Sequence, residues 1–544
     1  MLTSSASGRP IRSAIFLVAL GLALASPLAA QSGAGAAAQM PTLGDGSDLS
    51  SAAERRLGDR IAREIYRDPD YIDDPVLMDY VQGIWQPLLA AARARGDLSP
   101  ELAERFAWEI MLGRDRTVNA FALPGGYLGV HLGLIAVVSS RDELASVLAH
   151  ELSHVTQRHI SRLLSKQSQQ APWMIGAMIL GALAASKNPD AGSAMIVGGQ
   201  ALAVQNQLNF SRDMEREADR VGFGVMTQAG FEGQGFVTMF DKLQQASRLN
   251  DNGAYPYLRS HPLTTERSAD MQARQALLAP GLTNATLTPQ HAMMVARARV
   301  LSNPGVDSLR ALIAEADAAG VAALAASPQA GVLYGAALAA NQLRDFANAR
   351  GYLERLSLLA DLGPQAARLQ RLLEIEIALA VGDTVRAQAA LNASLLERPG
   401  QAGSGSTGGS DTVAARPELF LRAQIALQMK QGGLAGGAAA ITEAAQGLQN
   451  WVAKHPSDAS AWQLLASTSV AQGQSLRAIR ADAETQVARL DYAAALDRFR
   501  AAQELVRQRR GGNLTAAADH IEASIIDTRQ RQVQALLKEQ TLER

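Results

Sequence analysis

The stretch VLAHELSHVTQRH, residues 147–159, constrains the fold more than any other part of the chain. It contains three of the eight histidines among 544 residues. His150 and His154 are four positions apart, and residues at that spacing share one face of an α-helix, one turn apart. The sequence predicts a helix here, on which both rings can reach one ion.

The start of this helix is marked by S-R-D-E, Ser140 to Glu143. This spacing is a capping box, in which serine and glutamate side chains reciprocally bond each other's backbone amides. We therefore expect a helix from about Arg141. Glu151 follows His150 directly, about 100° around the helix axis, so that it lies near a bound ion without binding it.

H-E-x-x-H is a zinc-hydrolase pattern for a chemical reason. Two neutral imidazoles hold Zn²⁺, and the adjacent carboxylate takes a proton from the bound water, whose pKa the ion lowers to about 7. The alternative is a solvated helix face with incidental histidines. His159 does not fit as third ligand, because the extended motif H-E-x-x-H-x-x-G-x-x-H requires histidine at position 160. The other candidates are His261 and a carboxylate of NFSRDMEREADRVG, residues 209–222, which would complete a His₂Glu site open to water.

Four motifs in order resemble one family. HELSH is followed by S-R-x-x-E-x-x-A-D at residues 211–219, preceded by NAFALPGGY at 119–127, and followed again by SHPLTTER at 260–267. Together they resemble the zinc metallopeptidases that include the HtpX heat-shock protease and the CAAX prenyl proteases. The resemblance covers about residues 50 to 275. It implies one zinc ion held by His150, His154 and Glu215, with Glu151 as general base and then acid.

The resemblance also implies supporting residues. Asp219 and Arg267 would stand behind the metal ligands, with Asp219 orienting a histidine as such carboxylates do; the alternative for Asp219 is an exposed helix carboxylate. An extended substrate would add to a strand edge formed by Asn119, Ala120, Phe121 and Ala122. The alternative there is a purely structural hairpin.

His261 has three possible roles. It can donate a hydrogen bond to the oxyanion formed on the attacked carbonyl, or cap a structural loop. It can also fill the fourth position on zinc and hold the enzyme latent, which is the role that the resemblance favours.

The N-terminus reads as a signal peptide, residues 1–30, because Arg9 and Arg12 precede the apolar run 14–25 and small residues follow. Cleavage is expected after Ala30; the alternative is an uncleaved anchor. Residues 31–50 form a flexible, Gly/Ala/Ser-rich lead-in. The chain has no cysteine, which excludes disulfides and thiolate sites. Export to a Gram-negative periplasm fits these features best.

Two regions follow. Residues 51–280 predict an α+β metallopeptidase domain, mostly helical, with a strand, a tight turn at Pro124 and a second strand. Residues 290–540 predict an all-α, tetratricopeptide-like repeat domain, interrupted by a Gly/Ser loop at 400–411. The similar segments place the small residues Ala349, Ala387 and Ala495 where one helix packs on another. The alternative is an unrelated helical bundle.

The segment between the metal helices, residues 171–203, holds two apolar runs shorter than the roughly twenty residues that cross a bilayer. They can form buried helices, a lid over the zinc or a flap that contacts the membrane. The net charge is −1, without a Lys/Arg block, so nothing indicates nucleic-acid binding.

We therefore predict a periplasmic zinc endopeptidase whose repeats dock partners. The resemblance implies that the partners are unfolded or misassembled outer-membrane proteins and the β-barrel assembly machinery. The alternative is a chaperone or scaffold for barrel assembly, in which the metal site is silent.

Overall fold

The computed structural model describes residues 49–167, 211–248, 254–277, 287–396, 415–510 and 517–542. Ser47–Arg544 form one compact unit. The predicted signal peptide, nearly all of the lead-in, the apolar segment 171–203 and the Gly/Ser loop lie outside the described residues.

A small sheet carries the N-terminal half of the fold. Its strand order is β1-β2-β4-β3, so that β3 lies at an edge. The strands are β1 (Tyr71–Ile72), β2 (Glu109–Gly113), β3 (Ala120–Leu123) and β4 (Tyr127–His131). β3 and β4 pair antiparallel through the 3₁₀ turn η1 (Pro124–Gly126), as predicted, and β2 adds parallel to β4. Gly125 and Gly126 both have positive φ, 73° and 86°, which explains why this turn needs glycine.

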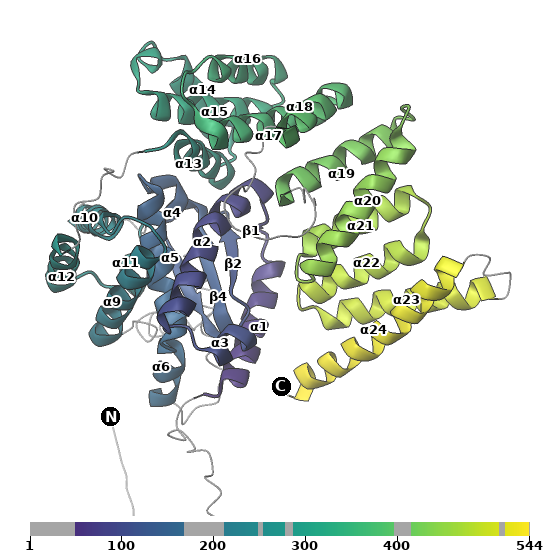
Figure 1. Cartoon of the computed structure of the whole chain (residues 1–544), viewed down its shortest axis with the longest axis horizontal. Helices are drawn as coiled ribbons and strands as arrows, with labels where there is room; N and C mark the ends of the chain where they lie inside the picture. The colour runs from purple at the N-terminus through teal and green to yellow at the C-terminus, as the bar shows by residue number, and fades with distance from the viewer. Residues whose placement is uncertain are drawn as a thin grey trace, which may run out of the picture. The chain divides into compact units, whose positions relative to one another are not determined.

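The helices around the sheet confirm the α+β prediction (Figure 1). Two of them, α5 (Arg141–Thr156) and α9 (Arg212–Gln228), pack on each other and carry the metal motifs. The others in this half are α1 (Ser51–Arg67), α2 (Pro75–Arg95), α3 (Pro100–Arg105), α4 (Leu132–Val137), α6 (His159–Gln167), α10 (Gln234–Arg248), α11 (Tyr257–Ser260) and α12 (Thr265–Ala276).

The cap of α5 is half of what the sequence predicts. The Ser140 hydroxyl accepts from the Glu143 amide at 3.1 Å, as expected. The reciprocal bond was predicted wrongly, because the Glu143 carboxylate accepts from the Ser139 amide at 2.6 Å instead. Lys242 of α10 also donates to that carboxylate at 2.7 Å, a distant partner that a local motif cannot predict.

The C-terminal region is helical, as predicted, and successive helices pack on one another (Figure 1). Ala349, Ala387 and Ala495 are fully buried, each in the first turn of its helix. The helices are α13 (Pro289–Ser302), α14 (Val306–Asp317), α15 (Ala326–Gln342), α16 (Phe346–Ser357), α17 (Gly363–Val381), α18 (Thr384–Leu396), α19 (Arg416–Gln431), α20 (Gly437–Lys454), α21 (Ala459–Ala471), α22 (Ser475–Ala488), α23 (Tyr492–Arg510) and α24 (Ala517–Leu542), with the 3₁₀ turn η3 (Val321–Ala323).

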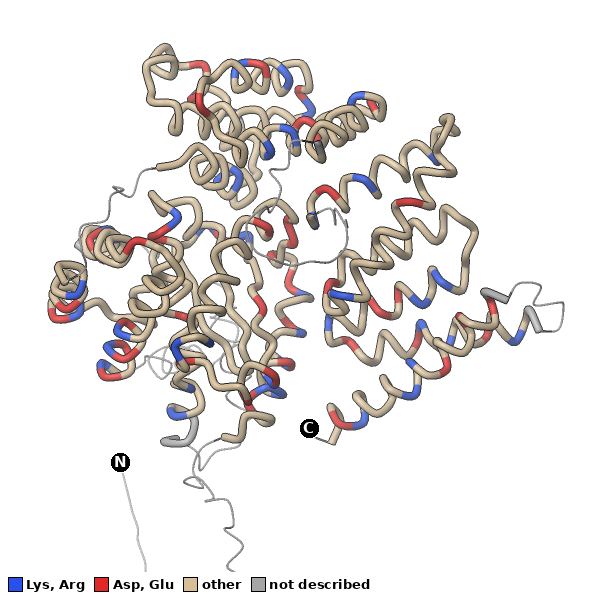
Figure 2. The backbone as a smooth tube through the Cα atoms, in the orientation of Figure 1, with Lys and Arg blue, Asp and Glu red and all other residues tan. Residues whose placement is uncertain are grey.

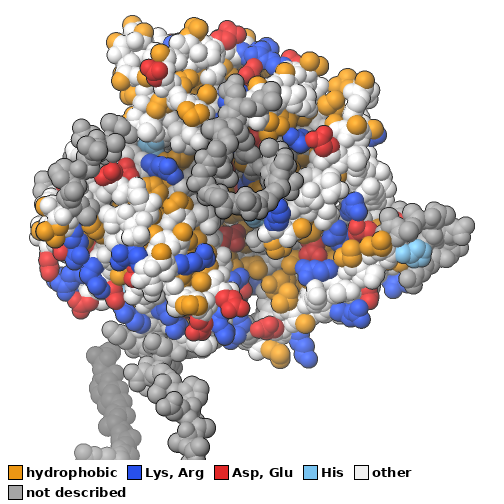
Figure 3. Space-filling view, in the orientation of Figure 1, with side chains coloured by type: hydrophobic (Ala, Val, Ile, Leu, Met, Phe, Trp, Pro, Cys, Tyr) orange, Lys and Arg blue, Asp and Glu red, His pale blue; other side chains and the backbone are white. Residues whose placement is uncertain are grey.

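Charges of both signs are interspersed along the helices, and one face of the surface shows the same mixture (Figures 2 and 3). Within the described ranges, every helix is too short or too polar to cross a membrane.

Candidate metal centre

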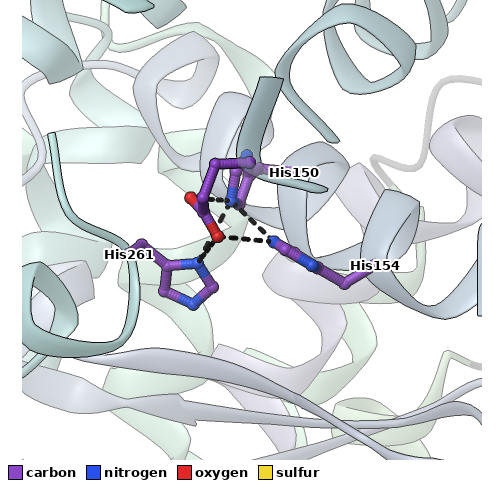
Figure 4. A group of neighbouring side chains, drawn as sticks. His150, His154 and His261 are labelled. Carbon is purple, nitrogen blue, oxygen red and sulfur yellow. Dashed lines mark hydrogen bonds and ion pairs between the residues drawn. The ribbon is translucent and has the colours of Figure 1, made fainter. Parts of the chain in front are cut away.

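Four buried side chains from three helices converge on one point. His150 and His154 project from α5, Glu215 from the first turn of α9, and His261 follows α11 directly. Their possible ligand atoms all lie within 4.8 Å of one another. Figure 4 shows the three imidazoles turned toward the same carboxylate. The structure thus brings together the two histidines of H-E-x-x-H and both remaining candidates for further ligands.

The spacing of these atoms matches a tetrahedral zinc site. Ligand atoms at about 2.0–2.1 Å from a tetrahedral ion lie about 3.3–3.4 Å apart. Here Nε2 of His150 is 3.0 Å from Nε2 of His154 and 3.3 Å from Nδ1 of His261. Oε1 of Glu215 is 3.4 Å from Nε2 of His154 and 3.1 Å from Nδ1 of His261. The donor set of three imidazoles and one carboxylate therefore fits zinc in type and in distance.

A buried arginine holds the carboxylates behind the cluster. Arg267 donates to both oxygens of Asp219, at 2.6 and 2.8 Å, and its Nη1 lies 2.8 Å from Oε2 of Glu215. Oδ1 of Asp219 in turn lies 2.9 Å from Nδ1 of His150. Such a partner on the second ring nitrogen fixes the orientation of a metal-binding histidine. Asp219 and Arg267 thus lie directly behind His150 and Glu215.

Glu151 lies beside the cluster with one oxygen occupied. Its Oε2 accepts from the backbone amide of Ala122 on the edge strand at 2.9 Å. Its Oε1 is buried, has no hydrogen-bond partner in the described part of the chain, and lies 3.4 Å from Nε2 of His261. Burial raises the pKa of Glu151, which favours a group that must accept and then return a proton near neutral pH.

The electrostatics of the cluster suit a cation. Burial opposes charge on His150, but the carboxylates of Asp219 and Glu215 outweigh it and raise the pKa of His150 to about 10. Burial also opposes charge on Glu215, yet His261 and His150 lower its pKa well below the usual value. Burial and the charge of His150 lower the pKa of His154. A bound cation would therefore take the place of the proton on His150.

The predicted substrate strand is an edge strand, and its outward side already has partners. Ala122 donates to Glu151, and Val118, just before β3, exchanges backbone hydrogen bonds with the segment leading to His261. In that exchange Val118 donates to the Ala254 carbonyl at 2.8 Å and accepts from the Tyr257 amide at 3.3 Å. Asn119, Ala120 and Phe121 lie in or beside this edge.

Two residues of this site, Tyr257 and His159, were not predicted from the sequence. Tyr257 is buried and stacks on the His261 ring, with centroids 4.6 Å apart. His159, which the extended motif rules out as a ligand, packs directly behind His154. Burial lowers the pKa of His159 to about 4. Its spacing of five residues from His154 was the available signal, but the turn that brings the two rings together depends on distant contacts.

Comparison with known proteins agrees with this geometry. Residues 88–275 match peptidase family M48. The chain is 30% identical over 325 residues to the beta-barrel assembly-enhancing protease of Escherichia coli strain K12, an alignment that covers 58% of this chain and 62% of that protein. It is 28% identical to the protein of the same name from Yersinia pestis, with 82% of this chain and 83% of the relative covered.

A shorter likeness reaches beyond bacteria. The chain is 32% identical over 165 residues to the mitochondrial metalloendopeptidase OMA1 of Arabidopsis thaliana. That alignment covers 30% of this chain and 31% of the plant protein.

Proposed function

We propose that the chain is a zinc-dependent endopeptidase, and the match of residues 88–275 to peptidase family M48 supports this. The observation that carries the proposal is the cluster of His150, His154, Glu215 and His261 with Glu151 beside it. His150, His154 and Glu215 would hold the ion. When bound, zinc would act as a Lewis acid on the peptide carbonyl and lower the pKa of a water to about 7.

The remaining steps belong to the protein's own side chains. Glu151 takes a proton from the attacking water and returns it to the leaving amine. An extended peptide would lie along β3 and bond its backbone there, as β-strand addition does elsewhere. Because Glu151 and the segment 254–257 occupy this edge in the structure, both must release it before substrate binds.

We further propose that His261 holds the enzyme latent. Its Nδ1 lies 3.3 Å from Nε2 of His150 and 3.1 Å from Oε1 of Glu215, about the distance between two ligand atoms of a tetrahedral ion. His261 would therefore fill the fourth ligand position, which a catalytic water needs. Its ring is clamped by stacking on Tyr257, and the backbone just before it pairs with Val118. One movement of residues 254–261 would therefore free both the fourth corner and the edge strand.

The proposed substrates are unfolded or misassembled outer-membrane proteins in the periplasm. Support comes from the relatives named beta-barrel assembly-enhancing protease and from the predicted signal peptide. The helical region 290–540 would dock clients or the β-barrel assembly machinery, since stacked helical pairs form extended binding surfaces.

The test is cleavage of casein, an unfolded protein, by the purified chain. We expect cleavage that a chelator abolishes and that stoichiometric zinc restores. A second candidate function, a chaperone or scaffold with a silent site, is favoured by the occupied fourth corner. It would be preferred if zinc-loaded protein suppresses aggregation of an unfolded barrel but cleaves nothing, even as the His261→Ala variant.

A further inference from the structure

A buried histidine lies behind His154, on the ring nitrogen that faces away from the proposed metal. Nδ1 of His159 is 2.9 Å from Nδ1 of His154, and the rings meet edge to face with centroids 4.9 Å apart. Nε2 of His159 lies 3.1 Å from Oε2 of Glu217. Arg162 donates to the same oxygen at 2.8 Å. The result is a line of contacts from Arg162 through Glu217 and His159 to His154.

The chain is bent to bring these rings together. Helix α5 ends at Thr156 and α6 begins at His159, with Arg158 between them at φ = +53°. A residue with a Cβ occupies this left-handed region only at a cost in conformational energy. Arg158 is held there from outside, because its guanidinium bonds Glu54 of α1 at 3.1 Å. The contact between the histidines is therefore built by the fold and is not a consequence of helical spacing alone.

Which atom donates and which accepts along this line can be assigned by starting from Glu217. The carboxylate of Glu217 can only accept, so that the neutral imidazole of His159 must carry its proton on Nε2. Nδ1 of His159 is then an acceptor, and Nδ1 of His154 must donate to it. A neutral His154 with its proton on Nδ1 carries its lone pair on Nε2, the atom that lies 3.4 Å from the Glu215 carboxylate.

From this order we propose that His159 is a positioning residue that sets the tautomer and ring orientation of His154 for metal binding. The inference rests on the proposed metal site and deepens it. Asp219 contacts the second ring nitrogen of His150 in the same way, with Oδ1 at 2.9 Å from Nδ1. Metal-bound histidines usually donate their second N–H to a carboxylate, a carbonyl or water, and loss of such a partner typically lowers metal affinity 10- to 100-fold. In this chain a histidine fills that place for one of the two ligands.

The experiment measures the zinc dissociation constant by chelator competition for three full-length proteins. His159→Leu keeps the bulk of the side chain but provides no acceptor, and we expect zinc affinity to fall about 10- to 100-fold. His159→Asn places an amide oxygen near the position of Nδ1, and we expect it to recover most of the lost affinity. If His159 had only a structural role, His159→Asn would not recover zinc affinity, because asparagine fills the space of the buried imidazole less well than leucine does.

The matched control is His291→Leu, since His291 is equally buried but bonds the Tyr80 hydroxyl and the Val138 carbonyl instead. It should leave zinc affinity within about twofold of the parent. Circular dichroism of the metal-free proteins checks that each variant is folded. If His159→Leu does not fold, Glu217→Leu removes the outer acceptor from a partly exposed position and should also weaken zinc binding.

The outcomes separate the two proposals. A parent chain that binds no zinc overturns the proposed metal site itself. A parent that binds one zinc ion, together with a folded His159→Leu or Glu217→Leu variant of unchanged affinity, overturns the positioning role alone. Failure of His159→Asn to exceed His159→Leu in affinity would also overturn it.

Discussion

At the scale of single residues, Glu151 has different hydrogen-bond partners from the four candidate metal ligands, His150, His154, Glu215 and His261. One oxygen accepts from the edge-strand amide of Ala122, and the other lies 3.4 Å from Nε2 of His261. A carboxylate in this position can exchange protons with a water without giving up a metal bond. The geometry therefore separates the proton-transfer role from the metal-binding role, and two substitutions can test them apart.

Glu151→Gln should retain zinc and lose peptidase activity. The change removes the base but none of the corner ligands, and general acid–base catalysis typically contributes 10²- to 10⁴-fold. We expect metal analysis to give one zinc per chain and casein turnover to fall in that range. Glu215→Ala is the paired control, because it removes a ligand and should lower zinc content first. Near-normal turnover by Glu151→Gln would contradict the assigned role.

His261→Ala should keep zinc and raise the basal cleavage of casein. Water can then enter the fourth corner, while His150, His154 and Glu215 remain. Turnover and zinc content of the same preparation provide the measurement. A fall of 10²- to 10³-fold with zinc retained would instead indicate an oxyanion donor. No change in either quantity would leave only a structural role.

How far the sequence predicts the site depends on distance along the chain. The positions of His150, His154 and Glu151 follow from helical geometry within five residues. His261 and the carboxylates of residues 209–222 were candidates from the residues alone, but only the family resemblance gave Glu215, Asp219 and His261 their roles, since nothing local links them to α5. His159 was dismissed because the motif rule considers only direct ligands. The bend at Arg158 that recruits it depends on Glu54, over a hundred residues earlier.

At the scale of elements, the site depends on how closely α9 approaches α5. Gly222 lies on the face of α9 that also carries Glu215 and Asp219, seven and three residues earlier. A Cβ added at Gly222 would lie 3.0 Å from the Ala149 carbonyl oxygen and 3.1 Å from the His150 amide. The two helices must therefore separate by a few tenths of an ångström to accept any larger residue.

Gly222→Ala should weaken zinc binding because it moves Glu215 away from both histidines of α5. Helix propensity favours alanine by about 1 kcal/mol, so stability can be maintained while the site loosens. Gly224→Ala is a matched control on the same helix, since its new Cβ would meet only the guanidinium end of Arg95, which can move aside. Chelator competition on both variants decides the matter, and equal zinc affinities would show that helix spacing does not set the site.

Among the elements, the sequence predicted those with a strong local pattern. The β3–β4 hairpin follows from its alternating residues and the glycines of its turn, and α5 from its serine cap. The parallel pairing of β2 with β4 was not predicted, because the partners join through a crossover that leaves no local signal. The reciprocal cap bond of Glu143 was predicted wrongly, because its carboxylate accepts from the Ser139 amide and also from Lys242 on another helix.

At the scale of the whole unit, we call the helices α13 to α24 the helical array. Three arginines of this array bind aspartates at the start of α2, within residues 73–79. Each also binds a carboxylate of the array and thus bridges the two regions. The pairs are Arg297 with Asp74 and Glu376, Arg368 with Asp79 and Glu418, and Arg416 with Asp73 and Asp458. One apolar core, which includes Trp85, Leu148 and Leu373, continues across the same boundary. Partners more than two hundred residues apart leave no pattern in a single sequence.

Arg297→Met should therefore destabilise the peptidase region and the array together. Arg297 and Asp74 are both less than a tenth exposed, and removing one partner of a buried ion pair typically costs about 3–5 kcal/mol, because the other charge stays buried. Arg299→Met, two residues along α13, is the control, since its pair with Glu315 is almost half exposed and should contribute at most about 1 kcal/mol.

Urea unfolding followed by two signals, casein cleavage and helical circular dichroism, measures the effect. We expect both midpoints of Arg297→Met to fall together, because the bridges and the continuous core couple the two regions. If the cleavage midpoint kept its parent value while the helical signal shifted, the peptidase region would unfold independently of the array and the coupling would be wrong.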